Sequence, residues 1–554
     1  MRKYFHKRIV FTVVVLFSLF ACESDYLEIN TDPNNPTEAP SDQVLTNVQV
    51  QIANTMSMGG SGLSSALSTY MHQTVQYRNS AFYAVTGSDY VISVSWGIFY
   101  NNILEDLRLL IEKQNAAGNL KYVGVGKILK AYTYGQMVNV WGDIPFSEAN
   151  RMPDIRFPKF DNDADIYSAI ITLLDSGIAD IKNEDAANVR VPASDDLFYG
   201  GDDNSWIALA NSVKLQLYNN MRLVEDVSSE VTALLEENLI SSSDLDFELE
   251  YGTSQEPENR NPGYVNEYTN ATMEYYISPW FYEIMKGWEG GDLAVVNPME
   301  GIVDPRIPYY WFNQVTVDEA ADVSQIEYSD DNFISIYFGG TGVFHGSGKD
   351  TEGTVPGLFP IGGRFDDQKG TDGDGVGVDY PGPGNVPMRL LTYYKMLFVR
   401  AELAQEGVSS ENARELFEAA MRASFAKVNQ VVEDYLPSQD NDNVPVISDA
   451  DIDTYVNAVL LRYDAADSDG QLQLIMTQKW IATFGNSVDQ YSDYRRTGYP
   501  VLYDPNADSL EETEVTRSFP LALPYSSNDL KINPNSPPEQ RKPAVDGVFW
   551  DVNN

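Results

Sequence analysis

The chain has 554 residues with 37 basic and 81 acidic side chains, and its formal net charge at pH 7 is −44. So acidic a surface repels phosphate groups, which makes nucleic acids and anionic lipid headgroups poor candidates as partners. Hydrophobic residues make up 43% of the chain, and no Ser/Gly-rich or Pro-rich linker divides it, so we expect one large domain with a substantial core.

The N-terminus has the layout of a secretory signal. A basic stretch over residues 2–8 precedes an apolar run over residues 9–20, which is too short to span the hydrocarbon core as a helix. The single cysteine of the chain, Cys22, follows in Leu19-Phe20-Ala21-Cys22, which resembles a lipobox. We therefore predict that residues 1–21 are a signal peptide and that Cys22 carries palmitate-type acyl chains that anchor the protein to a membrane. The alternative is a thiol in an ordinary signal peptide.

Periodicity organises the rest of the chain. Residues 22–41 form a polar tether, and helical spacing of apolar residues begins near Asp42. In the region between the two helical parts, glycine, proline, asparagine, aspartate and aromatic residues dominate. We predict a single domain over residues 42–554, with a helical scaffold in 42–240 and 388–500, a loop-rich region in 241–387 and an irregular tail in 501–554. The helical spacing is clearest in residues 91–111, 123–140, 166–181, 206–224, 389–406, 411–428, 451–461 and 471–484.

One helix pair has the spacing of a tetratricopeptide hairpin. Ala401 is followed by Ala413, then by Phe417 and Ala420, so that small residues let two helix backbones approach while the ring fills the groove between them. Any antiparallel helix pair is an alternative on spacing alone.

Several short motifs occur in order along the chain, and together they resemble the SusD/RagB-like family of nutrient-binding outer-membrane lipoproteins, in particular its second SusD-like branch. The motifs are NTDPNNP at 30–36, WGDIPFSEA at 141–149, DLFYGGD at 196–202, ANSVKL at 210–215, DPRIP at 304–308, AE at 401–402, QKWIA at 478–482, DYRRTGYP at 493–500 and LPY at 523–525. Their glycines, prolines and arginines also have plain structural roles, so we interpret them as parts of the scaffold.

This resemblance implies a mainly α fold, built as a tetratricopeptide-like helical-repeat scaffold with a long loop-rich ligand-binding region. It also implies an outer-membrane lipoprotein that faces the cell exterior, binds a nutrient such as an oligosaccharide, and passes it to a TonB-dependent, SusC-like barrel. Because RagB-like members take peptides, a peptide is the alternative ligand. A structural or adhesive lipoprotein without a small ligand is a third interpretation.

Residue counts leave little room for catalysis. After removal of the signal only His72 and His345 remain, too few for a three-histidine zinc site, and neither lies in a nucleophile or phosphate-binding motif. Carboxylates are numerous enough for a glycan-degrading enzyme, but the helical-repeat resemblance disfavours one. We expect a protein that is not an enzyme and holds no cofactor and no metal. We interpret the acidic loop at 366–379 as solvated, with calcium binding as the alternative.

Aromatic side chains offer flat surfaces to sugars or peptides, and the loop-rich region is dense in them. His345 is a further candidate for hydrogen bonding there, although a lone histidine in a loop is more often solvated. Trp96 shares an apolar stripe with Phe99 and Ile103, so we expect it in the core. We predict ligand binding by exposed rings and two polar partners, namely Tyr275, Tyr276, Trp288, Phe333, Phe344, Asn332 and Arg364.

Overall fold

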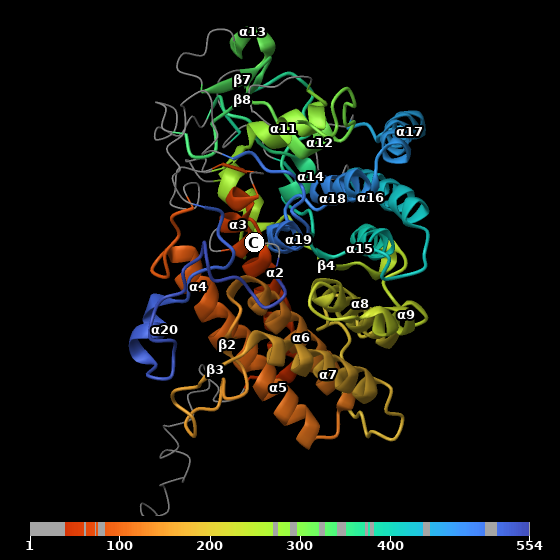
Figure 1. The fold of residues 1–554 in the computed structure, drawn as a ribbon. Coiled ribbons are helices and arrows are strands. Elements are labelled where there is room, and N and C mark those ends of the chain that lie inside the picture. Colours follow the sequence, from red (N-terminus) through yellow and green to blue (C-terminus); the bar gives the residue numbers. More distant parts are fainter. Residues whose placement is uncertain are drawn as a thin grey trace, which may run out of the picture.

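Long helices occupy two stretches of the chain, and short helices and strands occupy the stretch between them (Figure 1). The mainly α fold class predicted from the sequence is therefore confirmed. The computed structural model describes residues 39–59, 62–71, 74–75, 83–269, 275–288, 296–320, 327–340, 351–371, 375–376, 382–435, 444–504 and 518–552.

The first helical stretch contains the predicted periodic segments. In α7 the side chain of Asn162 caps the N-terminus by accepting from the Ala164 amide, and Ile166, Ile170 and Leu174 are buried at four-residue spacing. Two further helices, α3 and α9, have eight residues each, too few for a clear periodic signal. The elements are α2 (Ser41–Met56), α3 (Leu63–Tyr70), α4 (Tyr90–Gly97), η3 (Ile98–Leu104), α5 (Glu105–Ala116), α6 (Leu120–Trp141), α7 (Asp163–Ile181), α8 (Asp203–Met221) and α9 (Ser228–Leu235).

Two glycines let α6 and α7 approach closely. A Cβ atom at Gly124 of α6 would lie 2.7 Å from the carbonyl oxygen of Gly177 in α7, and a Cβ atom at Gly177 would lie 3.0 Å from the carbonyl oxygen of Gly124. Contacts under 3.0 Å are essentially never made by a Cβ atom, so the observed packing requires glycine at position 124 and leaves little room for a side chain at position 177.

The second helical stretch contains the predicted hairpin. Helix α15 (Tyr393–Gln405) packs against α16 (Ala413–Tyr435), and Ala401, Phe417 and Ala420 are buried. The alanines allow the close approach, and the ring of Phe417 fills the core between the helices. The remaining helices of this stretch are α17 (Asp449–Ala465), α18 (Ser468–Ala482) and α19 (Ser487–Thr497).

Much of the loop-rich stretch lies at one end of the molecule, at the top of Figure 1, whereas residues 247–249 lie nearer the middle. Within the described residues it contributes to small antiparallel pairs in place of one large sheet, namely β1–β5, β4–β10, β6–β9 and β7–β8, while β2 pairs with β3. Its rings and aliphatic side chains form a second apolar cluster beside the main core. The elements are η4 (Ser243–Leu245), β4 (Phe247–Leu249), α10 (Pro262–Tyr264), η5 (Val265–Thr269), β5 (Tyr276–Ile277), α11 (Pro279–Lys286), α12 (Ile307–Tyr310), β6 (Trp311–Phe312), α13 (Val317–Ala320), β7 (Tyr328–Asp330), β8 (Phe333–Ser335), β9 (Val355–Pro356), α14 (Leu358–Ile361) and β10 (Met388–Leu391), with β1 (Thr74–Val75), β2 (Ile144–Pro145), β3 (Phe160–Asp161) and α20 (Ser527–Ile532) elsewhere.

A buried ionic cluster joins four helices. Glu402 of α15 accepts a hydrogen bond of 2.7 Å from Arg496 of α19. Lys479 of α18 and Arg222, at the end of α8, lie 3.5 Å and 3.2 Å from its carboxylate. Asp493 supplies a second carboxylate, 2.9 Å from Lys479 and 2.6 Å from Arg496. Burial alone would raise the pKa of Glu402, but the surrounding cations outweigh it and hold the pKa well below its ordinary value.

Replacing Glu402 by glutamine should lower the free energy of unfolding by about 3–5 kcal/mol, because it leaves buried cations without their counter-charge. Urea unfolding followed by circular dichroism measures the loss. Asp464→Asn is the matched control, since Asp464 pairs with Arg414 at 2.6 Å with both side chains more than a third exposed, and such pairs contribute less than about 1 kcal/mol. Equal losses in the two variants would contradict the special role of the buried cluster.

Candidate functional site

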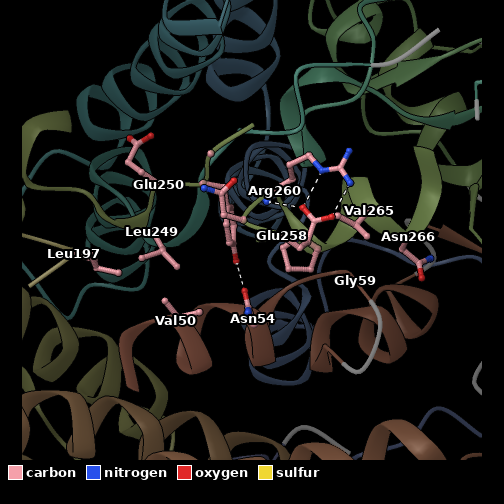
Figure 2. A pocket seen from close by; sticks show the side chains of 14 residues that line it. Val50, Asn54, Gly59, Leu197, Leu249, Glu250, Glu258, Arg260, Val265 and Asn266 are labelled. Atoms are coloured by element: carbon pink, nitrogen blue, oxygen red, sulfur yellow. Dashed lines mark hydrogen bonds and ion pairs between the residues drawn. The ribbon is translucent and has the colours of Figure 1, made fainter. Parts of the chain in front are cut away.

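A cleft of about 630 Å³ opens where α2 meets the loop that follows β4 (Figure 2). Its volume lies within the range of roughly 300–1,000 Å³ that is usual for small-molecule sites. The first wall comes from α2 and from Leu197 in the turn that precedes α8, and the second from the loop and from α10 and η5. The lining residues are Val50, Asn54, Gly59, Leu197, Leu249, Glu250, Tyr251, Gly252, Glu258, Asn259, Arg260, Pro262, Val265 and Asn266.

Two contacts hold the loop against α2. The hydroxyl of Tyr251 donates a hydrogen bond of 2.7 Å to Oδ1 of Asn54, which Figure 2 marks as a dashed line. Burial raises the pKa of Tyr251, so the hydroxyl keeps the proton that it donates. Further along, Gly59 lies so close to α10 that a Cβ atom there would be 2.2 Å from the carbonyl carbon of Pro262. These contacts fix the distance between the two walls.

Arg260 and Glu258 form the charged part of the lining. The guanidinium donates from Nε to Oε1 at 2.9 Å and from Nη2 to Oε2 at 2.6 Å. It also lies 5.5 Å from the ring centroid of Tyr264, which stacks on Tyr268. The hydrogen bonds from Arg260 lower the pKa of Glu258, so this carboxylate is ionised at neutral pH.

The rest of the lining combines apolar surface with side-chain amides. Val50, Leu249 and Val265 supply the apolar part, while the amides of Asn54 and Asn259 supply donors and acceptors. This mixture is typical of sites that bind an organic solute by covering its apolar faces and bonding its polar groups.

Three of the rings predicted to contact a ligand are in the interior. Tyr275 and Tyr276 are 2% and 1% exposed, and Tyr276 lies in β5. Phe333 is 1% exposed, and its ring stacks on Tyr282 with centroids 3.8 Å apart. The expectation that these rings are exposed is therefore wrong. The loop-rich region is long enough to build its own core, in which aromatic rings pack on one another.

The two predicted polar partners serve the same interior. Asn332 is buried and donates from Nδ2 to the carbonyl oxygen of Val315 at 3.1 Å. Arg364 is partly exposed, with its guanidinium 4.9 Å from the ring centroid of Phe312. The contact with Val315 gives Asn332 a structural role and removes it from the surface.

Trp288 is the one predicted ring that is partly exposed among those in the described part of the chain. It follows α11, where Gly287 adopts a φ of 62° and ends the helix. The ammonium of Lys286 lies 5.4 Å from its ring centroid. Phe344, His345 and His72 lie outside the described residues.

None of the six described residues predicted as ligand contacts lines the cleft of Figure 2. Trp96, expected in the core, is buried and lies 5.3 Å from Trp141, centroid to centroid. In the described part of the chain, no helix combines the length and apolarity that a membrane span requires. No cluster of three or more acidic, histidine or cysteine side chains is placed there to hold a metal ion.

A family model described as starch-binding associating with outer membrane matches residues 33–520. The chain belongs to this SusD-like family. The match extends over the helical scaffold and over the loop-rich stretch alike, and it confirms the family resemblance inferred from the motifs.

Solved structures share the fold of this SusD-like chain. A chitin-binding protein superposes with a TM-score of 0.66 at 20% identity, covering 93% of this chain and 100% of its own. A SusD homologue from Bacteroides fragilis gives 0.64 at 18% identity, with 93% and 99% covered. A chitin-binding SusD homologue from Flavobacterium johnsoniae gives 0.60 at 19% identity, with 93% and 98% covered. At these identities the likeness shows the fold alone. Among curated proteins no significant match is found.

Sequence reasoning missed the residues of the cleft. Tyr251 and Arg260 lie at the start of the loop-rich stretch, one aromatic and one basic residue among many. What distinguishes these two residues is the position of their loop, directly after β4 and spatially beside the DLFYGGD turn that carries Leu197. That adjacency depends on the tertiary fold and cannot be read from spacing.

The interpretation of the acidic loop at 366–379 as solvated is wrong for Asp366, which is buried and anchors the loops beside Asn332. Asp366 is 3% exposed, and its Oδ2 accepts from Asn313 at 2.7 Å and from Gln368 at 2.9 Å. Burial raises its pKa to about 6. Its neighbour Asp367 pairs with Lys369 at 2.7 Å and has a lowered pKa, because the contacts with Lys369 outweigh the effect of burial.

The contribution of Asp366 to the stability of the SusD-like protein should fall as the pH rises from about 4 to about 6, because folded Asp366 holds its proton over that range and the unfolded chain does not. The difference from an unfolded pKa of about 3.9 corresponds to roughly 3 kcal/mol. Because pH 4.5 already lies above the unfolded pKa, Asp366→Asn should remove about 2 kcal/mol of this fall in urea unfolding measured at pH 4.5, 5.5, 6.5 and 7.5.

Asp367→Asn is the control for this series. Its carboxylate has the opposite pKa shift, so its contribution is lost as the pH falls below about 4. The slope between pH 5 and 7 should stay as in the unsubstituted protein. If the stability of Asp366→Asn depends on pH in the same way as that of the unsubstituted protein, Asp366 titrates like an exposed carboxylate and the prediction is wrong.

Proposed function

We propose that this SusD-like protein is a cell-surface lipoprotein that binds an oligosaccharide and passes it to a TonB-dependent, SusC-like barrel of the outer membrane. The observation that carries the proposal is the match of a starch-binding, outer-membrane family model to residues 33–520. Two similar structures are named for chitin binding, which supports a glycan as the ligand class. The barrel partner follows from the family resemblance.

We propose the cleft of Figure 2 as the main ligand site. The ring of Tyr251 is held by its hydrogen bond to Asn54, so it offers a flat surface at little cost in side-chain entropy. Leu249 and Val265 extend the apolar surface, and nearby amides can bond hydroxyl groups.

A second proposed contact surface consists of Trp288 and Arg364, because both are partly exposed. Tyr275, Tyr276 and Phe333 are assigned to the core. We propose binding without catalysis and without a cofactor. A peptide is the alternative ligand, and it enters the test below as an outcome.

Tyr251→Ala should weaken glycan binding at least fivefold, because the ligand loses a rigid stacking surface. Titration calorimetry with the full chain and a panel of chito-, malto- and cello-hexaoses measures the affinity. Tyr251→Phe is the comparison variant, since it keeps the ring and loses the hydrogen bond to Asn54, and it should weaken binding less than Tyr251→Ala does.

Trp288→Ala separates the two surfaces. If Trp288→Ala abolishes binding while Tyr251→Ala has full affinity, the ligand site lies beside α11 and the cleft assignment is wrong. Binding of peptides with no response to any glycan would support the alternative ligand, and new reducing ends in the mixture would establish an enzyme.

Cys22→Ser should release the protein from the membrane, because a peptide chain without acyl groups has no anchor of this kind. Fractionation of cells grown with labelled palmitate tests this, and the unsubstituted chain should carry the label in the membrane pellet. Ser24→Ala is the control and should keep both label and location. A Cys22→Ser variant that stays in the pellet would show that something other than lipid holds the protein there.

A further inference from the structure

The charges that line the cleft are unequal in number. The lining has the carboxylates of Glu250 and Glu258 and the guanidinium of Arg260. The formal charge of the lining is therefore negative, on a chain whose formal net charge is −44. Across an exposed cleft, such a field acts over about 8 Å at physiological ionic strength.

The guanidinium of Arg260, the cation in the lining, is already paired within the protein. Arg260 uses two donors in a fork to Glu258, at 2.9 and 2.6 Å, and its main-chain amide donates to the same carboxylate at 3.0 Å. Its guanidinium also lies 5.5 Å from the ring centroid of Tyr264. A ligand carboxylate would have to displace Glu258 from this fork and leave that side chain ionised without its partner.

The side-chain amides of Asn54 and Asn259 are neutral donors that remain available to a ligand. Nδ2 of Asn54 and Nδ2 of Asn259 donate to no residue in the described part of the chain, while their Oδ1 atoms accept from Tyr251 and from the Ser254 amide. Each amide is therefore oriented by one bond and has its donor available to a hydroxyl or acetamido oxygen.

We propose that the cleft selects neutral and amine-bearing oligosaccharides and rejects those that carry carboxylate or sulfate groups. This inference rests on the proposed function, because it names the chemical class of the ligand at the same site. A neutral sugar keeps the Arg260–Glu258 pair intact and uses the asparagine amides. An anionic sugar meets a negative lining and finds its cation occupied.

The test compares chemical forms of one hexaose that differ in charge. The hexaose that binds best is compared with the product of oxidising its primary hydroxyls to carboxylates, by calorimetry on the full chain in 150 mM salt. Where the hexaose contains N-acetylglucosamine, its deacetylated, amine-bearing form is added. We expect the oxidised hexaose to bind at least tenfold more weakly and the amine-bearing form to bind at least as well as the neutral one.

Salt and substitution then identify the cause. The difference in affinity between the neutral and the oxidised hexaose should become smaller in 1 M salt, because screening weakens the repulsion. Glu258→Gln should reduce this difference, here called the gap, at least threefold, because it removes a carboxylate and leaves Arg260 available to the ligand. Glu237→Gln is the control, since Glu237 lines a separate groove beside α9, and it should leave the gap unchanged.

The outcomes distinguish this inference from the proposed function. An oxidised hexaose that binds as tightly as the neutral one overturns the charge selection and leaves glycan binding standing. A chain that binds no hexaose of either kind overturns the proposed function itself. The salt series uses the unsubstituted protein, so it remains decisive if Glu258→Gln fails to fold.

Discussion

The buried carboxylate of Glu402 is the constraint on which the helical scaffold depends. It is compensated by cations from other helices, so α8, α15, α18 and α19 must meet in one arrangement for the charges to balance. Apolar side chains tolerate small shifts of one helix along another, whereas a buried charge that loses its partner is costly. Two more buried groups act in the same way, namely Lys395 with Asp489, and Lys427 with Asp246 and Glu248. Arg306 pairs with Asp304 of its own loop and donates to Ser424 of α16.

The motifs that carry the family resemblance meet one another inside the protein. Arg306 of the DPRIP motif donates to Gln478 of the QKWIA motif at 3.1 Å. Trp141 of the WGDIPFSEA motif donates to the carbonyl oxygen of Pro524 in the LPY motif at 3.1 Å. Asp196 accepts from Trp206 of α8 and from Gln49 of α2. These residues are used for folding, so they identify the family and carry no information about the ligand. Among the arginines of these motifs, Arg306 binds the carboxylate of Asp304, whereas Arg495 donates to main-chain oxygens of Leu521 and Asn139.

The difference between residues used for folding and residues that line the cleft explains what the sequence could predict. The long helices follow from apolar spacing, as in α7, and the hairpin of α15 and α16 follows from its alanines and Phe417. The binding residues do not follow, because the chain has 34 tyrosines, 24 phenylalanines and 8 tryptophans, and spacing in a loop does not say which rings are exposed. Phe333 and Tyr276 resemble surface rings in sequence, yet Phe333 stacks on Tyr282 and Tyr276 packs in an apolar cluster that only the fold assembles.

The cleft lies between the helical scaffold and the loop-rich stretch. Its first wall is α2 with Leu197 of a scaffold motif, while its second wall is a loop outside the motifs. Asn261 ties the base of that loop, since its amide donates to the carbonyl oxygen of Gly384 at 2.7 Å and its Nδ2 donates to that of Val386 at 3.0 Å. With the base fixed in this way, residues 251–260 can differ in charge and shape without disturbing the helices. In the proposed site, side chains such as Glu258 and Arg260 would set the chemistry of the ligand. The buried charges of the scaffold, such as Glu402 and Arg496, are instead paired with one another.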